Sequence, residues 1–159
     1  MSLTAEQEAF LTKGALAAVT AEKATGCPAE LSLAQAILES SWGFCAPENN
    51  YFGIKATGED PNTYCLTKEY LNGQWTIQRD AFAVYSSMAD SFIEHARLIT
   101  EGKPYADAWQ QYEQDRDLDS LIGNIARRYA TDPNYTALVL QLAHGPHVTV
   151  AIQTVRAAA

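Results

Sequence analysis

The pattern of the sequence changes between Tyr64 and Tyr85, and this change constrains the fold more than any other feature. The runs YCLTKEYL, QWTIQ and FAVY are β-compatible, and Asn72-Gly73 separates the first two. Asn-Gly between two such runs is the strongest short-range signal for a β-hairpin. The segment therefore predicts a small antiparallel sheet of two or three strands, over about residues 60–85.

Helical spacing of apolar residues fills the chain on both sides of this sheet. Thr4 and Gln7 form a capping box, which predicts a helix over about residues 5–24, and Pro28 fits the first position of a second helix that closes at Gly43. The spacing predicts further helices over residues 88–100, 105–112, 118–129 and 134–143, and an ordered loop over 44–62. The tail from 146 to 159 suits a strand or a helix equally. We expect an α+β fold, mainly helical, with a small β-hairpin lobe.

Length and charge narrow the domain count and the function classes. A chain of 159 residues is about one domain, so we expect a single domain over residues 1–159. Nineteen acidic against eleven basic residues leave a net charge of -8, which argues against nucleic-acid binding because phosphate contacts need clustered Lys and Arg. No apolar run is long enough to span a membrane, and the N-terminus lacks the pattern of a signal peptide.

Glu39 is the first candidate for chemistry. It lies near the C-terminal end of the second predicted helix, on one face with Gln35 and Trp42. A carboxylate beside an indole in a partly dry cleft has a raised pKa, and the negative end of the helix dipole acts in the same direction. Such an acid stays protonated near neutral pH and donates to a leaving oxygen. From spacing alone, an ordinary surface glutamate is the alternative.

The sequence around Glu39 resembles a known enzyme family. LSLAQAILESSWG followed by ENNYFGIKA is similar to the pattern A-Q-x-x-x-E-[ST]-x-W-G, then N-N-x-F-G-I-K, of the endo-β-N-acetylglucosaminidases of glycoside hydrolase family 73, which include flagellar-type peptidoglycan hydrolase domains. TKEYLNG, FAVYSSMADSFIEHARLI and YATDPNYTALVLQL match in the same order. The resemblance implies a lysozyme-like fold whose groove binds peptidoglycan glycan strands, and cleavage of the β-1,4 bond between N-acetylglucosamine and N-acetylmuramic acid.

The resemblance also implies three catalytic residues: Glu39 as the general acid, Glu69 as a second carboxylate in the β lobe, and Tyr129 as a hydrogen-bonding group in the cleft. Paired carboxylates lie about 5 Å apart in retaining glycosidases and roughly 6.5 to 9.5 Å apart in inverting ones. In a third route, the acetamido group of the substrate is the nucleophile and the second carboxylate orients it. The sequence leaves all three routes open.

We expect substrate contacts from seven residues that surround these positions: Gln35, Trp42, Asn50, Tyr51, Phe52, Lys55 and Tyr135. Aromatic rings stack on sugar faces, and an amide fits N-acetyl or hydroxyl groups. A packing role is the alternative for Trp42, Phe52 and Tyr135. We expect no cofactor and no metal.

The sequence allows two rival functions, and it leaves the state of the cysteines and the route of export open. Cleavage at the muramic acid side, as by a muramidase or lytic transglycosylase, and a glycan-binding module without activity are the rival functions. Cys27, Cys45 and Cys65 are either three free thiols or one free thiol and a Cys45–Cys65 bridge. We expect a monomer acting in the periplasm or cell wall, exported by a holin, a secretion system or another route. Any immunity or delivery protein is left open.

Overall fold

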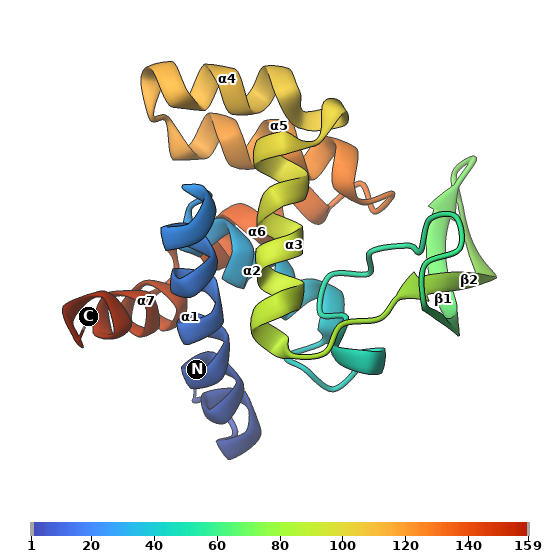
Figure 1. The fold of residues 1–159 in the computed structure, drawn as a ribbon, viewed down its shortest axis with the longest axis horizontal. Helices are drawn as coiled ribbons and strands as arrows, with labels where there is room; N and C mark the ends of the chain where they lie inside the picture. The colour runs from blue at the N-terminus through green and yellow to red at the C-terminus, as the bar shows by residue number, and fades with distance from the viewer. Residues whose placement is uncertain (1, 159) are drawn as a thin grey trace.

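A computed structural model describes residues 2–158 as a body of helices from which a β-hairpin projects (Figure 1). The helices are α1 (Ala5–Thr25), α2 (Ala29–Ser40), α3 (Met88–Glu101), α4 (Ala106–Asp115), α5 (Leu118–Tyr129), α6 (Tyr135–His144) and α7 (Pro146–Ala158). The antiparallel strands β1 (Asn62–Leu71) and β2 (Gln74–Ala83) form the hairpin. The predicted mainly helical α+β fold is confirmed. Within residues 2–158, no helix combines the length and the hydropathy needed to cross a membrane.

Local signals begin and end most of these elements as predicted. Thr4 and Gln7 form the capping box of α1, and the Ser87 side chain caps α3. Asn72 and Gly73 have φ values of 52° and 78°, which suit the tight turn between the paired strands. These signals are read within a few residues of chain, which is why the sequence alone locates them.

Helix α2 ends three residues earlier than the predicted stop at Gly43. The Ser40 hydroxyl donates to the carbonyl oxygen of Ala36 (2.6 Å) and accepts from the N–H of Gly43 (2.9 Å). Ser41 and Trp42 then take positive φ values of 50° and 60°. Because two consecutive left-handed residues break the helical path, the chain after Ser40 turns in a new direction.

The tail that suited a strand or a helix equally forms helix α7. Val148 and Ile152 lie one turn apart on it and are fully buried, and α7 packs against α1, α2 and α6. The apolar positions of this segment fit both periods, so packing against other helices decides its structure.

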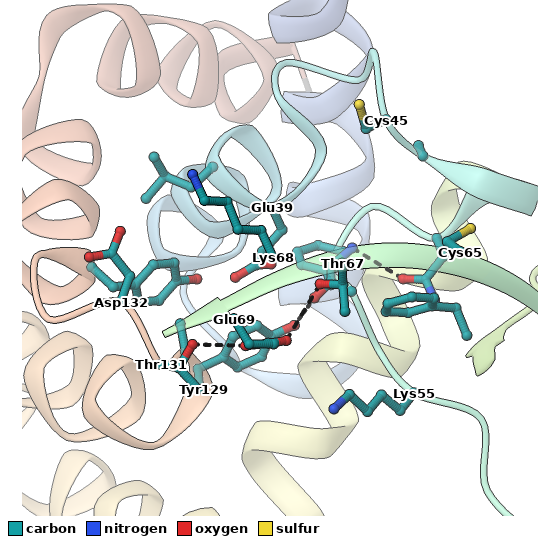
Figure 2. Close-up of a pocket in the computed structure, with 18 of the residues that line it drawn as sticks. Glu39, Cys45, Lys55, Cys65, Thr67, Lys68, Glu69, Tyr129, Thr131 and Asp132 are labelled. Carbon is teal, nitrogen blue, oxygen red and sulfur yellow. Dashed lines mark hydrogen bonds between the residues drawn. The ribbon is translucent and has the colours of Figure 1, made fainter. Parts of the chain in front are cut away.

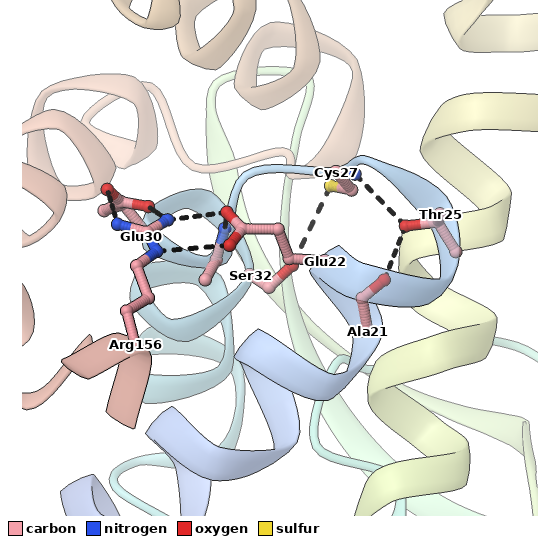
Figure 3. Close-up of polar contacts among 8 residues, drawn as sticks. Ala21, Glu22, Thr25, Cys27, Glu30, Ser32 and Arg156 are labelled. Carbon is pink, nitrogen blue, oxygen red and sulfur yellow. Dashed lines mark hydrogen bonds and ion pairs between the residues drawn. The ribbon is translucent and has the colours of Figure 1, made fainter. Parts of the chain in front are cut away.

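Arg156 of α7 joins three helices through one ion cluster (Figure 3). Its guanidinium donates to the carboxylates of Glu22 on α1 (2.6 Å) and Glu30 on α2 (2.8 Å). Glu22 also accepts from the N–H of Ala29 (3.0 Å), one of the unpaired groups at the start of α2. The cluster therefore fixes the beginning of the helix that carries Glu39 at its other end.

The loop between α2 and β1 is anchored in the core. Phe52 is fully buried and its ring stacks on that of His95, with centroids 3.9 Å apart and planes 13° from parallel. The Asn50 amide donates to the carbonyl oxygens of Ile54 (2.8 Å) and Ala83 (3.0 Å). Because Ala83 ends β2, this amide ties the loop to the base of the hairpin.

Candidate active site

A cleft of about 890 Å³ separates the helical body from the hairpin (Figure 2). Glu39 lines it from the end of α2, and Glu69 lines it from β1. Figure 2 shows the two carboxylates directed into this space from different elements. The structure therefore brings together two acids that lie 30 residues apart in the sequence, as a glycosidase site requires.

The Glu39 carboxyl group is largely shielded from water. Burial raises its pKa from 4.5 to about 7, a hydrogen bond from the Tyr135 hydroxyl opposes this rise, and the charge of Glu69 adds to it. The backbone of Gly53 passes close to the Glu39 carboxylate: a side chain at this position would place its Cβ 3.2 Å from Glu39 Oε2. An acid with this pKa is still partly protonated at neutral pH, as a general acid must be.

The shared helix face predicted for Glu39 and Trp42 is wrong. Because α2 ends at Ser40, Trp42 lies beyond the helix, and its ring packs edge-on against Phe10 at 6.5 Å between centroids. Trp42 is outside the cleft lining, where Tyr129 and Tyr135 are present instead. The raised pKa of Glu39 is thus as predicted in direction, but tyrosines from α5 and α6 surround it in place of the indole.

Glu69 is held by a residue that the sequence did not single out. The Thr131 hydroxyl, in the loop between α5 and α6, donates to Glu69 Oε2 (2.8 Å) and accepts from the N–H of Tyr70 (2.9 Å). The Thr67 hydroxyl lies 3.5 Å from Glu69 Oε1. Thr131 therefore ties β1 to the helical body and orients the second carboxylate at the same time.

Tyr129 and Tyr135 line the cleft side by side, with ring centroids 6.2 Å apart and nearly parallel planes. The Tyr129 hydroxyl donates to the carbonyl oxygen of Phe52 (2.6 Å). The Tyr135 hydroxyl accepts from the Gln35 amide (3.1 Å), and its own hydrogen bonding lowers the pKa of Glu39. Burial raises the pKa of both phenols well above 10, so both stay protonated. Tyr135 thus affects the pKa of the acid, whereas the Tyr129 hydroxyl donates its proton to the backbone.

The predicted substrate contacts divide into two groups. The first group lies outside the cleft lining and consists of Gln35, Trp42 and Tyr51. The second group lines the cleft and consists of Asn50, Phe52, Lys55 and Tyr135. Among the second group, Asn50, Phe52 and Tyr135 are buried. Lys55 is exposed and pairs with Asp80 at 3.5 Å. The first group supports the site from the core, and Lys55 is the member of the second group most open to a ligand.

Exposed apolar side chains that sequence reasoning missed also line the cleft: Phe44, Leu66, Trp75 and Leu138. Trp75 is 47% exposed and packs against Tyr70 at 5.1 Å between centroids. Strand pairing places Trp75 opposite Tyr70, next to the pair of Glu69 and Thr76. An exposed ring beside a cleft is a surface for stacking.

Of the two cysteine states that the sequence left open, the structure of residues 2–158 has three free thiols and no Cys45–Cys65 bridge. Both thiols line the cleft and are free, Cys45 in the loop after α2 and Cys65 on β1. Cys27 is a buried free thiol whose pKa is raised by burial to about 12. The described residues also include no group of three or more His, Cys, Asp or Glu side chains placed to hold a metal ion.

Comparison with known proteins identifies the family. The glucosaminidase family model, described as mannosyl-glycoprotein endo-beta-N-acetylglucosaminidase, matches residues 15–146. A probable N-acetylmuramidase of Lactococcus lactis is 35% identical over 143 residues, covering 84% of this chain and 32% of that protein. The peptidoglycan hydrolase FlgJ of Escherichia coli is 35% identical over 143 residues, with 84% and 45% coverage. The chain thus spans less than half the length of either relative.

A solved structure agrees with this match. The crystal structure of a peptidoglycan hydrolase mutant from Sphingomonas sp. A1 is 26% identical, covers 92% of this chain and 99% of its own, and superposes with a TM-score of 0.76. The family match includes both cleft carboxylates, Tyr129 and Thr131. This chain belongs to the glucosaminidase family of glycoside hydrolases and has its lysozyme-like fold.

Proposed function

We propose that this domain hydrolyses peptidoglycan glycan strands at the β-1,4 bond between N-acetylglucosamine and N-acetylmuramic acid. The observation that carries the proposal is Glu39, an acid with a pKa of about 7 that shares an open cleft with Glu69. Family membership and the names of the relatives support the substrate class. Peptidoglycan lies in the cell wall, so we propose that the domain acts there or in the periplasm.

The two carboxylates divide the chemistry. Glu39 gives its proton to the glycosidic oxygen as the bond from that oxygen to the anomeric carbon breaks. The Glu69 carboxylate stabilises the positive charge that develops on the sugar ring. Water adds to the anomeric carbon, and the proton that it releases restores Glu39. The exposed rings of Phe44 and Trp75 offer faces on which neighbouring sugars stack.

The ends of the products test the bond assignment. Purified peptidoglycan digested with this protein should yield fragments with N-acetylglucosamine at the reducing end, as identified by mass spectrometry after borohydride reduction. N-acetylmuramic acid ends would assign a muramidase, and anhydromuramic ends a lytic transglycosylase. Absence of any product above a Glu39→Gln control would leave a glycan-binding module.

Thr131→Val is expected to lower kcat/KM on peptidoglycan by about 10- to 100-fold, mainly through kcat. Valine keeps the shape of threonine but removes a hydrogen bond to a carboxylate, which is worth about 1.5 to 3 kcal/mol. Glu69 then loses the contact with the helical body that orients it. Thr131→Ser retains the hydroxyl and should stay close to the native rate. A native rate for Thr131→Val would show that the hydroxyl does not matter, and a loss confined to Thr131→Ser would assign the effect to the methyl group.

A further inference from the structure

A line of buried hydrogen bonds runs from Glu39 into the core. Tyr135 and Glu39 line the same cleft, and hydrogen bonding by the Tyr135 hydroxyl lowers the pKa of Glu39. Gln35 Nε2 donates to the Tyr135 oxygen at 3.1 Å. His95 Nε2 lies 2.8 Å from Gln35 Oε1. Gln35 and His95 are both fully buried. Four residues from α2, α3 and α6 are thus connected, although two of them lie outside the cleft lining.

The partners of His95 fix its tautomer. Burial lowers the pKa of His95 to about 3, so the ring is neutral at the pH of the cell and carries one N–H. The Gln35 Oε1 atom can only accept, and therefore the proton is on Nε2. His95 Nδ1, the other ring nitrogen, has no hydrogen-bond partner among the described residues, which fits a nitrogen that carries a lone pair rather than a proton.

This polarity continues along the line. Since His95 holds Gln35 Oε1, the amide presents its N–H₂ group to Tyr135. The Tyr135 oxygen accepts the hydrogen bond from Gln35, and the Tyr135 hydroxyl proton is therefore available to Glu39. Every donor in the line therefore points toward the Glu39 carboxylate.

We infer that His95 and Gln35 are positioning residues that direct the Tyr135 hydroxyl proton at Glu39. The inference rests on the proposed function of Glu39 as the acid. Without the His95 N–H, the Gln35 amide is free to rotate, and its oxygen then competes with Glu39 for the Tyr135 proton. The acid loses a hydrogen bond that favours its ionised form.

The surroundings allow few substitutes for this contact. Phe52 stacks on His95, and the edge of the Tyr129 ring lies 5.8 Å from it between centroids. The titratable groups that face Glu39 are Glu69 from β1, Tyr129 from α5 and Tyr135 from α6. Because the Tyr129 hydroxyl donates to the Phe52 carbonyl oxygen, the Tyr135 hydroxyl is the one available to donate to Glu39.

His95→Phe tests the inference through the pH profile. Phenylalanine keeps a ring stacked on Phe52 but removes the N–H. Loss of the directed hydrogen bond favours protonated Glu39, so the alkaline limb of kcat/KM should move up by about half a pH unit or more. His95→Gln places an amide N–H close to the position of Nε2 and should restore the native limb. His147→Gln, at an exposed histidine on α7, is the matched control.

Two results would overturn the inference. One is an alkaline limb in folded His95→Phe that coincides with the native one. The other needs no variant: ¹⁵N NMR of the native protein should show Nε2 protonated and Nδ1 unprotonated, and the opposite tautomer contradicts the argument even if His95→Phe does not fold. An inactive Glu39→Gln together with an unmoved limb rejects only this inference, whereas an active Glu39→Gln rejects the proposed role of Glu39 as the acid.

Discussion

Glu39→Gln is expected to lower the rate of peptidoglycan hydrolysis by about 10³-fold or more. Glutamine has the size of the native side chain and can still accept the hydrogen bond from Tyr135, but it has no acidic proton to give the leaving oxygen. General acid catalysis contributes about 10²- to 10⁴-fold, and this acid is the one whose pKa of about 7 suits the task. The same pKa predicts that native activity falls as the pH rises above about 7, because the protonated fraction of Glu39 then falls.

Release of reducing sugar ends from purified peptidoglycan measures this loss. Glu59→Gln removes one carboxylate from an exposed position in the loop before β1 and should hydrolyse at the native rate. Circular dichroism of both variants confirms that each one is folded. Native-like turnover by Glu39→Gln would assign the acid to another residue.

The same substitution is expected to stabilise the folded protein above pH 7, by up to about 3 kcal/mol. The pKa of Glu39 rises from 4.5 to about 7 on folding, and each pKa unit corresponds to about 1.36 kcal/mol. Below pH 4.5 the acid is protonated in both the folded and the unfolded states, so its titration does not lower the free energy of unfolding there. Between pH 4.5 and 7 the folded state binds more protons than the unfolded state, so native stability falls as the pH rises. Glutamine has no such titration.

Urea unfolding at about pH 4 and about pH 8 checks the sign of this effect. The free energy of unfolding of Glu39→Gln should exceed that of the native protein at the higher pH, and the difference should shrink at the lower one. Glu59→Gln should follow the native protein at both. A difference that does not change with pH would mean that desolvation of Glu39 is not its source. The catalytic acid is thus expected to lower the stability of the fold that holds it.

Both predictions depend on a residue that the sequence was able to identify. Glu39 lies in a motif whose residues are within a few positions of one another, and Glu69 lies in a short strand motif, so the resemblance of these motifs to the family is enough to propose both. The hairpin and the starts of α1 and α3 were predicted for the same reason, because turns and helix caps depend on neighbouring residues.

The position of Trp42 depends on more than its neighbours in the sequence. A helix continued to Gly43 would have placed its indole beside Glu39, but the Ser40 hydroxyl ends α2 early and the ring packs on Phe10. Helix α7 is a second example. The spacing of its apolar residues fits a strand as well as a helix, and packing against α1 and α2 decides for the helix.

The sequence by itself determined the fold class and the place of the hairpin, and it alone suffices to propose Glu39 and Glu69 as the two carboxylates. The tertiary structure alone decided which groups act on them: Thr131 reaches Glu69 across 62 residues of chain, and His95 reaches Gln35 across 60. Strand pairing, turns and caps are encoded by periodicity and by hydrogen bonds between near neighbours. A contact between distant residues has no such period, because it depends on how several helices pack around one core.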